Sequence, residues 1–124
     1  MIAADSSTII DFMKGSSGKH VETFIGALQA GNIVLPPVVL TEMLSDPGLP
    51  SEHRSLVMEW PMLEMVEGYW IRAAQSRARL LHLKLRARLP DTLIAQSCID
   101  HDVALITRDE DFRHFTKHCG LKLA

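Results

Sequence analysis

Short apolar segments alternate with longer helical patterns along the chain. Residues 2–4, 33–35 and 103–106 are short and entirely apolar, which is typical of buried β-strands. Residues 62–66 alternate weakly between apolar and polar positions and predict a further strand. No hairpin dipeptide joins these segments, and a helical pattern separates them. We therefore expect an α/β fold of three layers (α/β/α), with helices on both faces of a mostly parallel central sheet.

Apolar residues at intervals of three and four predict the helices between these strands. A short helix is expected after the capping residues 5–8, ending near Gly15, and another over residues 20–30. Glycine and proline residues mark the ends of several further patterns, and these predict helices over residues 38–44, 51–61, 68–89 and 91–99. A last short helix is expected from about Phe112.

The chain has 124 residues, 47% of them hydrophobic and 23% charged, which predicts one globular domain spanning residues 1–124. A net charge of −2 excludes a global positive field that would attract nucleic acid. The longest apolar run, residues 33–40, contains two prolines and is far shorter than the roughly 20 residues of a membrane span. The N-terminal segment has no basic region typical of a signal peptide, so we expect a cytoplasmic protein without membrane contact.

Acidic residues follow the predicted strands or begin the helices after them. Because ligands of parallel sheets bind beyond the carboxyl ends of the strands, we expect these side chains to share one edge. Such carboxylates repel one another unless a cation neutralises them, and Mg²⁺ prefers hard oxygen ligands. The candidates are Asp5, Glu42, Asp91, Asp109 and Asp111.

Each acid also has an ordinary structural explanation. Asp91 follows a proline and is a reasonable N-cap, and Asp109 and Asp111 are reasonable turn acids before a short helix. Glu42 could be a solvated helix residue, although its apolar flanks argue against a fully exposed face. Asp5 is harder to explain in this way, because the serines beside it would cap a helix equally well. The metal hypothesis therefore depends on the combination of acids.

Four segments together resemble the PIN domain, in order through nearly the whole chain. They are residues 5–7 (DSS), 40–44 (LTEML), 89–95 (LPDTLIA) and 105–112 (LITRDEDF). The chain length is also similar to that of VapC-like toxins from bacterial toxin–antitoxin pairs. A mild departure is Ser6, where the commonest family pattern has threonine, and the hydroxyl is retained.

The resemblance implies a ribonuclease that depends on Mg²⁺ or Mn²⁺ and cleaves RNA with a metal-activated water. Its acidic cluster would be Asp5, Glu42, Asp91 and Asp109, with Asp111 as an accessory ligand. Hydrogen bonds from Ser6 and Thr107 would support this cluster. The resemblance also implies an antitoxin protein that blocks the acidic site, and it allows pairing of the toxin into a homodimer.

A basic segment precedes Pro90. Residues 68–90 contain six Lys and Arg and no acid, which provides the local positive charge that the whole chain lacks. The candidates for contacts with RNA phosphates are Arg72, Arg77, Arg79 and Arg86. The alternative is an ordinary solvated helix face. The aromatic residues Trp60, Tyr69 and Trp70 lie beside apolar helical stripes and are expected in the core.

Two other functions remain open at this stage. A metal-dependent phosphatase or DNA nuclease would use a similar acidic site on a similar sheet. A catalytically degenerate domain that binds a partner protein is the second alternative. The full set of acids argues against it, because clustered like charges give a binding module no advantage.

Overall fold

Three short parallel strands form the centre of the fold. The computed structural model describes residues 1–124. It contains β1 (Ile2–Ala4), β2 (Ile33–Val34) and β3 (Ala104–Ile106) in the order β2-β1-β3. Ile2 is opposite Ile33 on one side and Ala104 on the other. The first strand therefore lies in the middle of the sheet, and the carboxyl ends of all three strands meet at one edge.

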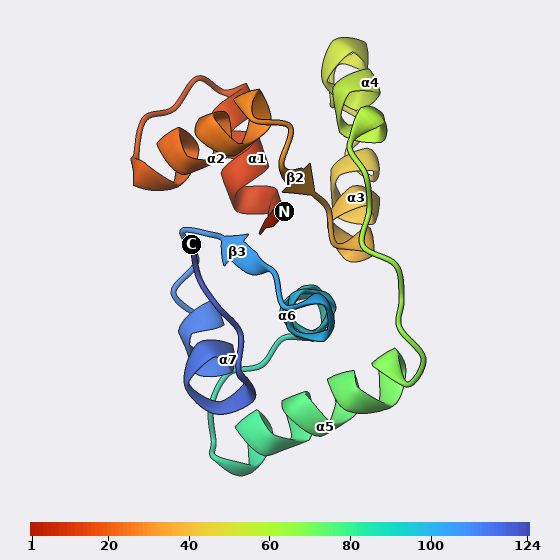
Figure 1. Cartoon of the computed structure of the whole chain (residues 1–124), viewed down its shortest axis with the longest axis vertical. Helices are drawn as coiled ribbons and strands as arrows, with labels where there is room; N and C mark the ends of the chain where they lie inside the picture. Colours follow the sequence, from red (N-terminus) through yellow and green to blue (C-terminus); the bar gives the residue numbers. More distant parts are fainter.

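Seven helices surround this sheet (Figure 1). The helix α2 contacts both β2 and β3 and packs on α1, whereas α6 contacts β3 and is covered in turn by α3, α5 and α7. The predicted three-layer α/β architecture is confirmed. The helices are α1 (Ser6–Met13), α2 (Lys19–Gln29), α3 (Pro37–Leu44), α4 (Ser51–Glu59), α5 (Tyr69–His82), α6 (Leu89–His101) and α7 (Phe112–Cys119).

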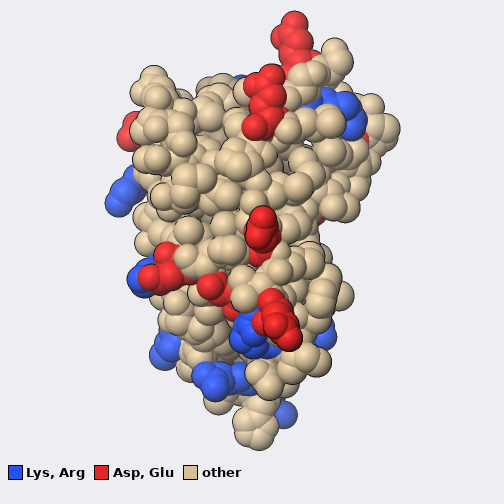
Figure 2. All heavy atoms as spheres, turned by 45° about the vertical axis from the view of Figure 1, so that its right-hand side comes forward, with Lys and Arg blue, Asp and Glu red and all other residues tan.

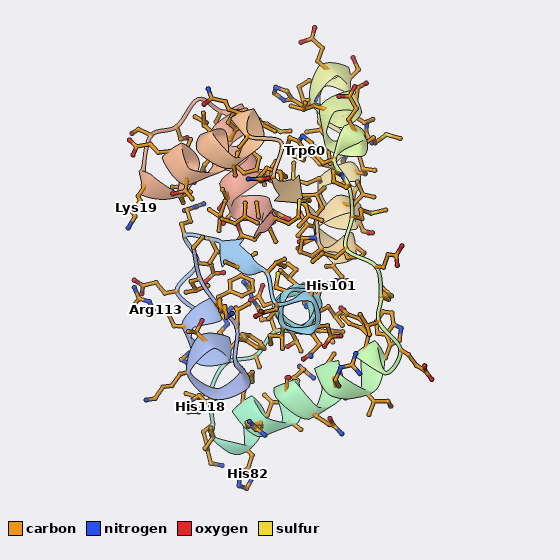
Figure 3. The ribbon with its side chains drawn as sticks, viewed as in Figure 1. Lys19, Trp60, His82, His101, Arg113 and His118 are labelled. Carbon is orange, nitrogen blue, oxygen red and sulfur yellow. The ribbon has the colours of Figure 1, made fainter.

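The core follows from the burial of β1 on both faces. Ala3 and Ala4 are completely buried, and their small side chains let the helices of both layers approach the sheet closely. Phe24 of α2 is completely buried and packs against Trp60, with ring centroids 5.6 Å apart. Trp60 lies near β2 (Figure 3). Tyr69 is also buried, as expected. Trp70 was also expected in the core, but it lies on the outer face of α5 and is 58% exposed.

Three predicted elements differ from the structure. Residues 62–66 form no strand, and only Met62 makes an isolated parallel bridge, with Leu35. The helix expected over residues 68–89 ends at His82, because Lys84 adopts a left-handed backbone conformation (φ 63°) that no helix accommodates. Asp91 is not an N-cap, because α6 already begins at Leu89. No helix is both long and apolar enough to cross a membrane.

Candidate active site

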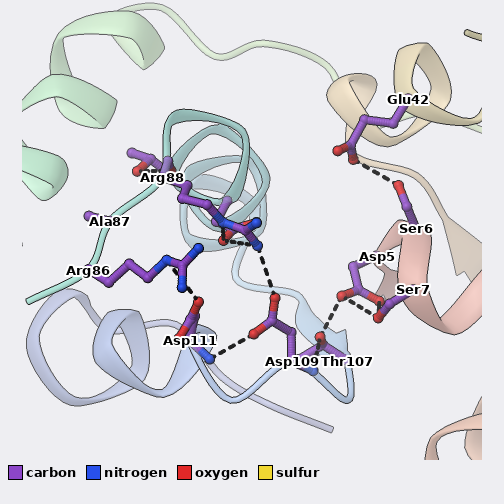
Figure 4. A network of polar contacts seen from close by, with 12 residues as sticks. Asp5, Ser6, Ser7, Glu42, Arg86, Ala87, Arg88, Thr107, Asp109 and Asp111 are labelled. Atoms are coloured by element: carbon purple, nitrogen blue, oxygen red, sulfur yellow. Dashed lines mark hydrogen bonds and ion pairs between the residues drawn. The ribbon is translucent and has the colours of Figure 1, made fainter.

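The edge where the parallel strands end gathers the predicted acids (Figure 4). Asp5 directly follows β1, and Asp109 and Asp111 lie in the turn between β3 and α7. Asp91 lies in the first turn of α6, and Glu42 lies in the second half of α3. Four separate parts of the sequence thus meet at one edge, as the positions of the acids predicted.

Three of the acids form a compact group. Carboxylate oxygens of Asp91, Asp109 and Asp111 all lie within 4.8 Å of one another. Asp91 is buried, whereas the side chains of Asp109 and Asp111 are each 30% exposed. The backbone N–H of Asp111 donates to Asp109 Oδ1 at 2.9 Å, which fixes the two turn acids relative to each other. The three carboxylates are close enough to share one ion.

Asp5 is held by its own turn and by β3. It is 4% exposed and is the N-cap of α1, accepting a hydrogen bond from the backbone N–H of Thr8 at 3.0 Å. Ser7 Oγ donates to the same carboxylate at 2.9 Å. The serines beside Asp5 therefore do not replace it as the cap: one of them hydrogen-bonds to it instead.

Thr107 connects Asp5 to the three clustered acids. Its hydroxyl donates to Asp5 Oδ2 and accepts a hydrogen bond from the backbone N–H of Asp109 at 3.0 Å. One side chain of the β3 edge thus aligns acids that are more than one hundred residues apart in the sequence. These hydrogen bonds are of the kind that was expected of Thr107, and its role in supporting a metal site stays a prediction.

Glu42 is joined to the others through Ser6. Ser6 Oγ donates to Glu42 Oε1 at 2.8 Å, and Ser6 is the next residue after Asp5. Glu42 is exposed, as a solvated helix residue would be, but it also contacts Ser6 and lines a hollow beside α1, so it does not lie on a fully exposed face. Exposure leaves its carboxylate accessible to water at the rim of the site.

The charges of the site are unevenly compensated. Burial raises the pKa of Asp91 above its ordinary value, and the neighbouring Arg88 guanidinium opposes this shift. The negative charges of Asp109 and Asp111 raise the Asp91 pKa further. The pKa of Arg88 is raised in return by its attraction to Asp91. Electrostatics in this group therefore favour a positive charge among the carboxylates.

The donor set fits a hard dication. The clustered ligand atoms are all carboxylate oxygens, which Mg²⁺ and Mn²⁺ prefer, and no imidazole or thiol lies among them. The partial exposure of Asp109 and Asp111 leaves room for the water ligands that Mg²⁺ retains.

The basic residues predicted to contact RNA are largely engaged within the protein. Arg72 forms two hydrogen bonds with Asp100, at 2.7 and 2.9 Å, and joins α5 to α6. Arg77 donates to the backbone carbonyl of Ala87, and Arg79 to that of His118, both at 2.8 Å. Arg86 is the most exposed partner of the acidic group, with its Nε 3.5 Å from Asp111 Oδ2. On the face shown in Figure 2, acidic side chains cross the middle and basic ones gather below them.

Two contributors to the site were not identified from the sequence. One is Ser7, which donates to Asp5 but cannot be distinguished in the sequence from the other small polar residues that begin a helix. Arg88 is the other: it was counted in the basic segment, yet it contacts Asp91 and Asp109 directly. The available signal was its spacing: Arg88 lies three residues before Asp91 at the start of a helix, which brings the two side chains close together.

A cavity of about 450 Å³ opens beside Ser6 and Glu42. Its walls come from α1, the end of α3 and the start of α4, and they combine apolar and charged side chains. Its lining includes Ile10, Met13, Lys14, Met43, Leu49 and His53. The rim of the acidic site therefore continues into a partly apolar hollow.

Comparisons with known proteins agree with this geometry. A search of curated protein sequences found no match. Among solved structures, a chain of VapBC2 from Rickettsia felis, crystallised bound to a DNA fragment from its promoter, superposes with a TM-score of 0.74. The match covers 100% of this chain and 98% of that chain at 15% sequence identity, so it shows the shared fold. A protein-family profile described as the PIN domain matches residues 2–118. Since this match spans nearly the whole chain, the protein belongs to the PIN domain family, whose members are in general nucleases.

Proposed function

We propose that the protein is a metal-dependent endoribonuclease and the toxin of a VapC-like toxin–antitoxin pair. The observation that carries this proposal is the convergence of five acids from four separate segments at the carboxyl edge of the sheet. Membership of the PIN family and the fold shared with a chain of a VapBC complex support the same function.

The acidic group would hold Mg²⁺ or Mn²⁺ through Asp91, Asp109 and Asp111, with Asp5 completing the shell directly or through water. The bound cation would supply the charge that activates water and offsets the negative charge of the phosphodiester transition state. The protein's own contribution is to orient these ligands. Thr107 and Ser7 fix the carboxylate of Asp5 through their hydroxyl groups.

Glu42 has a different position and a different proposed task. It is exposed, and its Oε1 accepts a hydrogen bond from Ser6. A carboxylate fixed at the open rim can accept a proton from an attacking water or orient that water. Ser6 would serve as the positioning residue for Glu42.

RNA phosphates would contact the arginines that border the acidic group. Arg86 is the strongest candidate of the four, because its side chain is 64% exposed and lies beside Asp111. Arg72, Arg77 and Arg79 keep their positive charge while they bridge elements of the fold. Their proposed contribution to RNA binding is therefore the long-range attraction of a basic surface.

The decisive experiment measures cleavage of single-stranded and structured RNA by the purified protein. We expect Mg²⁺- or Mn²⁺-dependent cutting that EDTA abolishes and that Asp5→Asn and Asp91→Asn reduce by at least about a hundredfold. Asp102→Asn is the matched control, because Asp102 is an exposed acid away from the site that pairs with Lys122. Undiminished cutting by the chelated or substituted protein contradicts the proposal.

The same assay separates the alternatives. Cleavage of DNA or of a phosphomonoester, with RNA left intact, identifies the metal-dependent DNA nuclease or phosphatase. Absence of all three activities, together with absence of metal binding, identifies the degenerate protein-binding module. Each result replaces the ribonuclease proposal.

We also propose an antitoxin partner. The cavity beside Ser6 and Glu42 has a partly apolar lining, so a partner segment packed there would cover the rim of the acidic site. Expression of the chain alone is expected to arrest growth, and co-expression of a small neighbouring gene product to relieve the arrest. Growth that is unaffected by an RNA-cleaving chain contradicts a toxin role.

A further inference from the structure

The segment between α5 and α6 directs two arginines at the acidic group. Arg86 and Arg88 flank Ala87, which is buried and whose carbonyl oxygen accepts a hydrogen bond from Arg77 at 2.8 Å. Ala87 therefore anchors the segment, while its two neighbours extend toward the carboxylates (Figure 4).

Arg88 makes the closer contacts. Its Nε lies 3.1 Å from Asp91 Oδ2, and its Nη2 lies 3.1 Å from the same oxygen and 3.3 Å from Asp109 Oδ2. One guanidinium thus spans two of the three acids that could share an ion, and Arg86 faces the third, Asp111. The two arginines together supply the positive charge that the clustered carboxylates require.

The side chain of Arg88 can leave without disturbing the fold. Its backbone carbonyl accepts hydrogen bonds from the N–H of Thr92 at 3.0 Å and from Thr92 Oγ1 at 2.9 Å, so the main chain belongs to the start of α6. The side chain is 49% exposed, and all its hydrogen bonds and ion pairs are with Asp91 and Asp109. The Arg72–Asp100 pair is different, because it joins two helices and the side chain of Asp100 is buried.

We propose that Arg88 is a built-in counter-ion of the acidic group that a divalent metal must displace, so that Arg88 sets the metal concentration at which the site fills. This inference rests on the metal site of the proposed function. The guanidinium contacts carboxylates of Asp91 and Asp109 that would also hold a dication, and two positive charges repel each other when both are near. Loss of Arg88 removes both the competition and the repulsion.

Calorimetric titration with Mn²⁺, in the absence of RNA, tests the proposal. Arg88→Met keeps the aliphatic length and the backbone contacts of Arg88 but removes its charge. We expect it to tighten Mn²⁺ binding by about five- to tenfold at low ionic strength. Arg88→Lys, which keeps the charge on a different head group, is expected to bind Mn²⁺ with an intermediate affinity. Arg113→Met is the matched control, because Arg113 forms an exposed pair with Glu110 outside the acidic group.

A second measurement guards against a folding defect. Without metal, Arg88→Met is expected to unfold at a lower temperature than the unmodified protein, because Asp91 and Asp109 lose their main counter-ion. Saturating Mn²⁺ is expected to raise the unfolding temperature of Arg88→Met by more than that of the unmodified protein. If Arg88→Met is too unstable to titrate, the Mn²⁺-induced rise in unfolding temperature is compared between Arg88→Lys and the unmodified protein. A larger rise for Arg88→Lys supports the proposal, and an equal or smaller rise overturns it.

The outcomes separate this proposal from the proposed function. Equal or weaker Mn²⁺ binding by Arg88→Met, with binding lost in Asp91→Asn, overturns the counter-ion role and leaves the metal site intact. Absence of Mn²⁺ binding in the unmodified protein and in Arg88→Met overturns the metal site and the inference together.

Discussion

At the scale of single residues, Asp5 combines a structural role with the metal-binding role that we propose for it. Its carboxylate caps α1 and also accepts hydrogen bonds from Ser7 and Thr107. The hydrogen-bond donors that orient the carboxylate therefore also secure the start of α1. Substitutions at this position need to separate the loss of charge from the loss of the cap.

Asp5→Ala and Asp5→Asn are expected to separate these roles. Asparagine is as good an N-cap as aspartate, whereas alanine leaves the N–H of Thr8 without a partner, at a cost of about 1 kcal/mol. Urea denaturation without metal is expected to show this loss of unfolding free energy for Asp5→Ala and a smaller change for Asp5→Asn. Both variants should lose RNA cleavage. Equal destabilisation by the two substitutions would contradict the capping role.

The two cysteines are expected to react very differently. Cys98 is completely buried in α6, and burial raises its pKa to about 12, so almost no thiolate exists at pH 8. Burial also raises the pKa of Cys119, but this residue is partly exposed. A disulfide reagent at pH 8 should label one thiol of the folded protein, at Cys119, and two after denaturation. Rapid labelling of both in the folded state would be inconsistent with this structure.

At the scale of elements, strongly patterned segments were predictable and isolated irregularities were not. Buried parallel strands are apolar along their whole length, so the segments that form β1, β2 and β3 stood out. Residues 62–66 were expected to form a strand, but only Met62 pairs with the sheet segment, through an isolated bridge to Leu35. The end of α5 carries no glycine or proline, and the left-handed residue there is a lysine, so no local signal marked the break.

The acidic edge was predictable for a related reason. Once the strands were taken as parallel, Asp5, Asp109 and Asp111 had to lie near the same edge. The contacts of long side chains do not follow from such spacing. Arginines that looked like a free basic face are bonded to carbonyls and acids of neighbouring elements, as Arg72 and Arg77 show. Only the packed fold reveals which guanidinium groups are engaged.

The pair that joins α5 to α6 is expected to give a pH-dependent contribution to stability. The hydrogen bond from Arg72 holds the pKa of Asp100 below its ordinary value, so this contribution is present above about pH 4 and is lost as the pH falls through the lowered pKa. Arg72→Met should lower the unfolding temperature at pH 7, with a difference that narrows below pH 4. Arg113→Met, which removes an exposed pair, is the control. A pH-independent difference would contradict this assignment.

At the scale of the whole molecule, an apolar surface lies on the outer side of α5 and α6. Trp70, Leu81 and Leu89 are 58%, 49% and 55% exposed. They line a shallow hollow of about 420 Å³ together with Ala73, Ala74 and Leu93. Exposed apolar surface of this kind is typical of a protein interface, and it is where we expect the homodimer contact that the family resemblance allows.

Self-association through this surface is expected to depend on Leu81. The protein should form dimers in light-scattering chromatography, and Leu81→Glu should shift it to monomers because a charge cannot be buried unpaired at the contact. Lys117→Glu, on the exposed side of α7, is the control for the added charge. A monomer at all concentrations, or dimers that persist in Leu81→Glu, would place any contact elsewhere.

The central position of β1 affects how the protein is made. Its neighbours in the sheet come from residues 33–34 and from residues 104–106. The first strand to be synthesised can therefore pair with β3 only when almost the whole chain has been made. Thr107, which orients Asp5, is synthesised immediately after that final partner. A nascent chain therefore cannot assemble the acidic edge, and the RNA cleavage that we propose would begin only when translation is nearly finished.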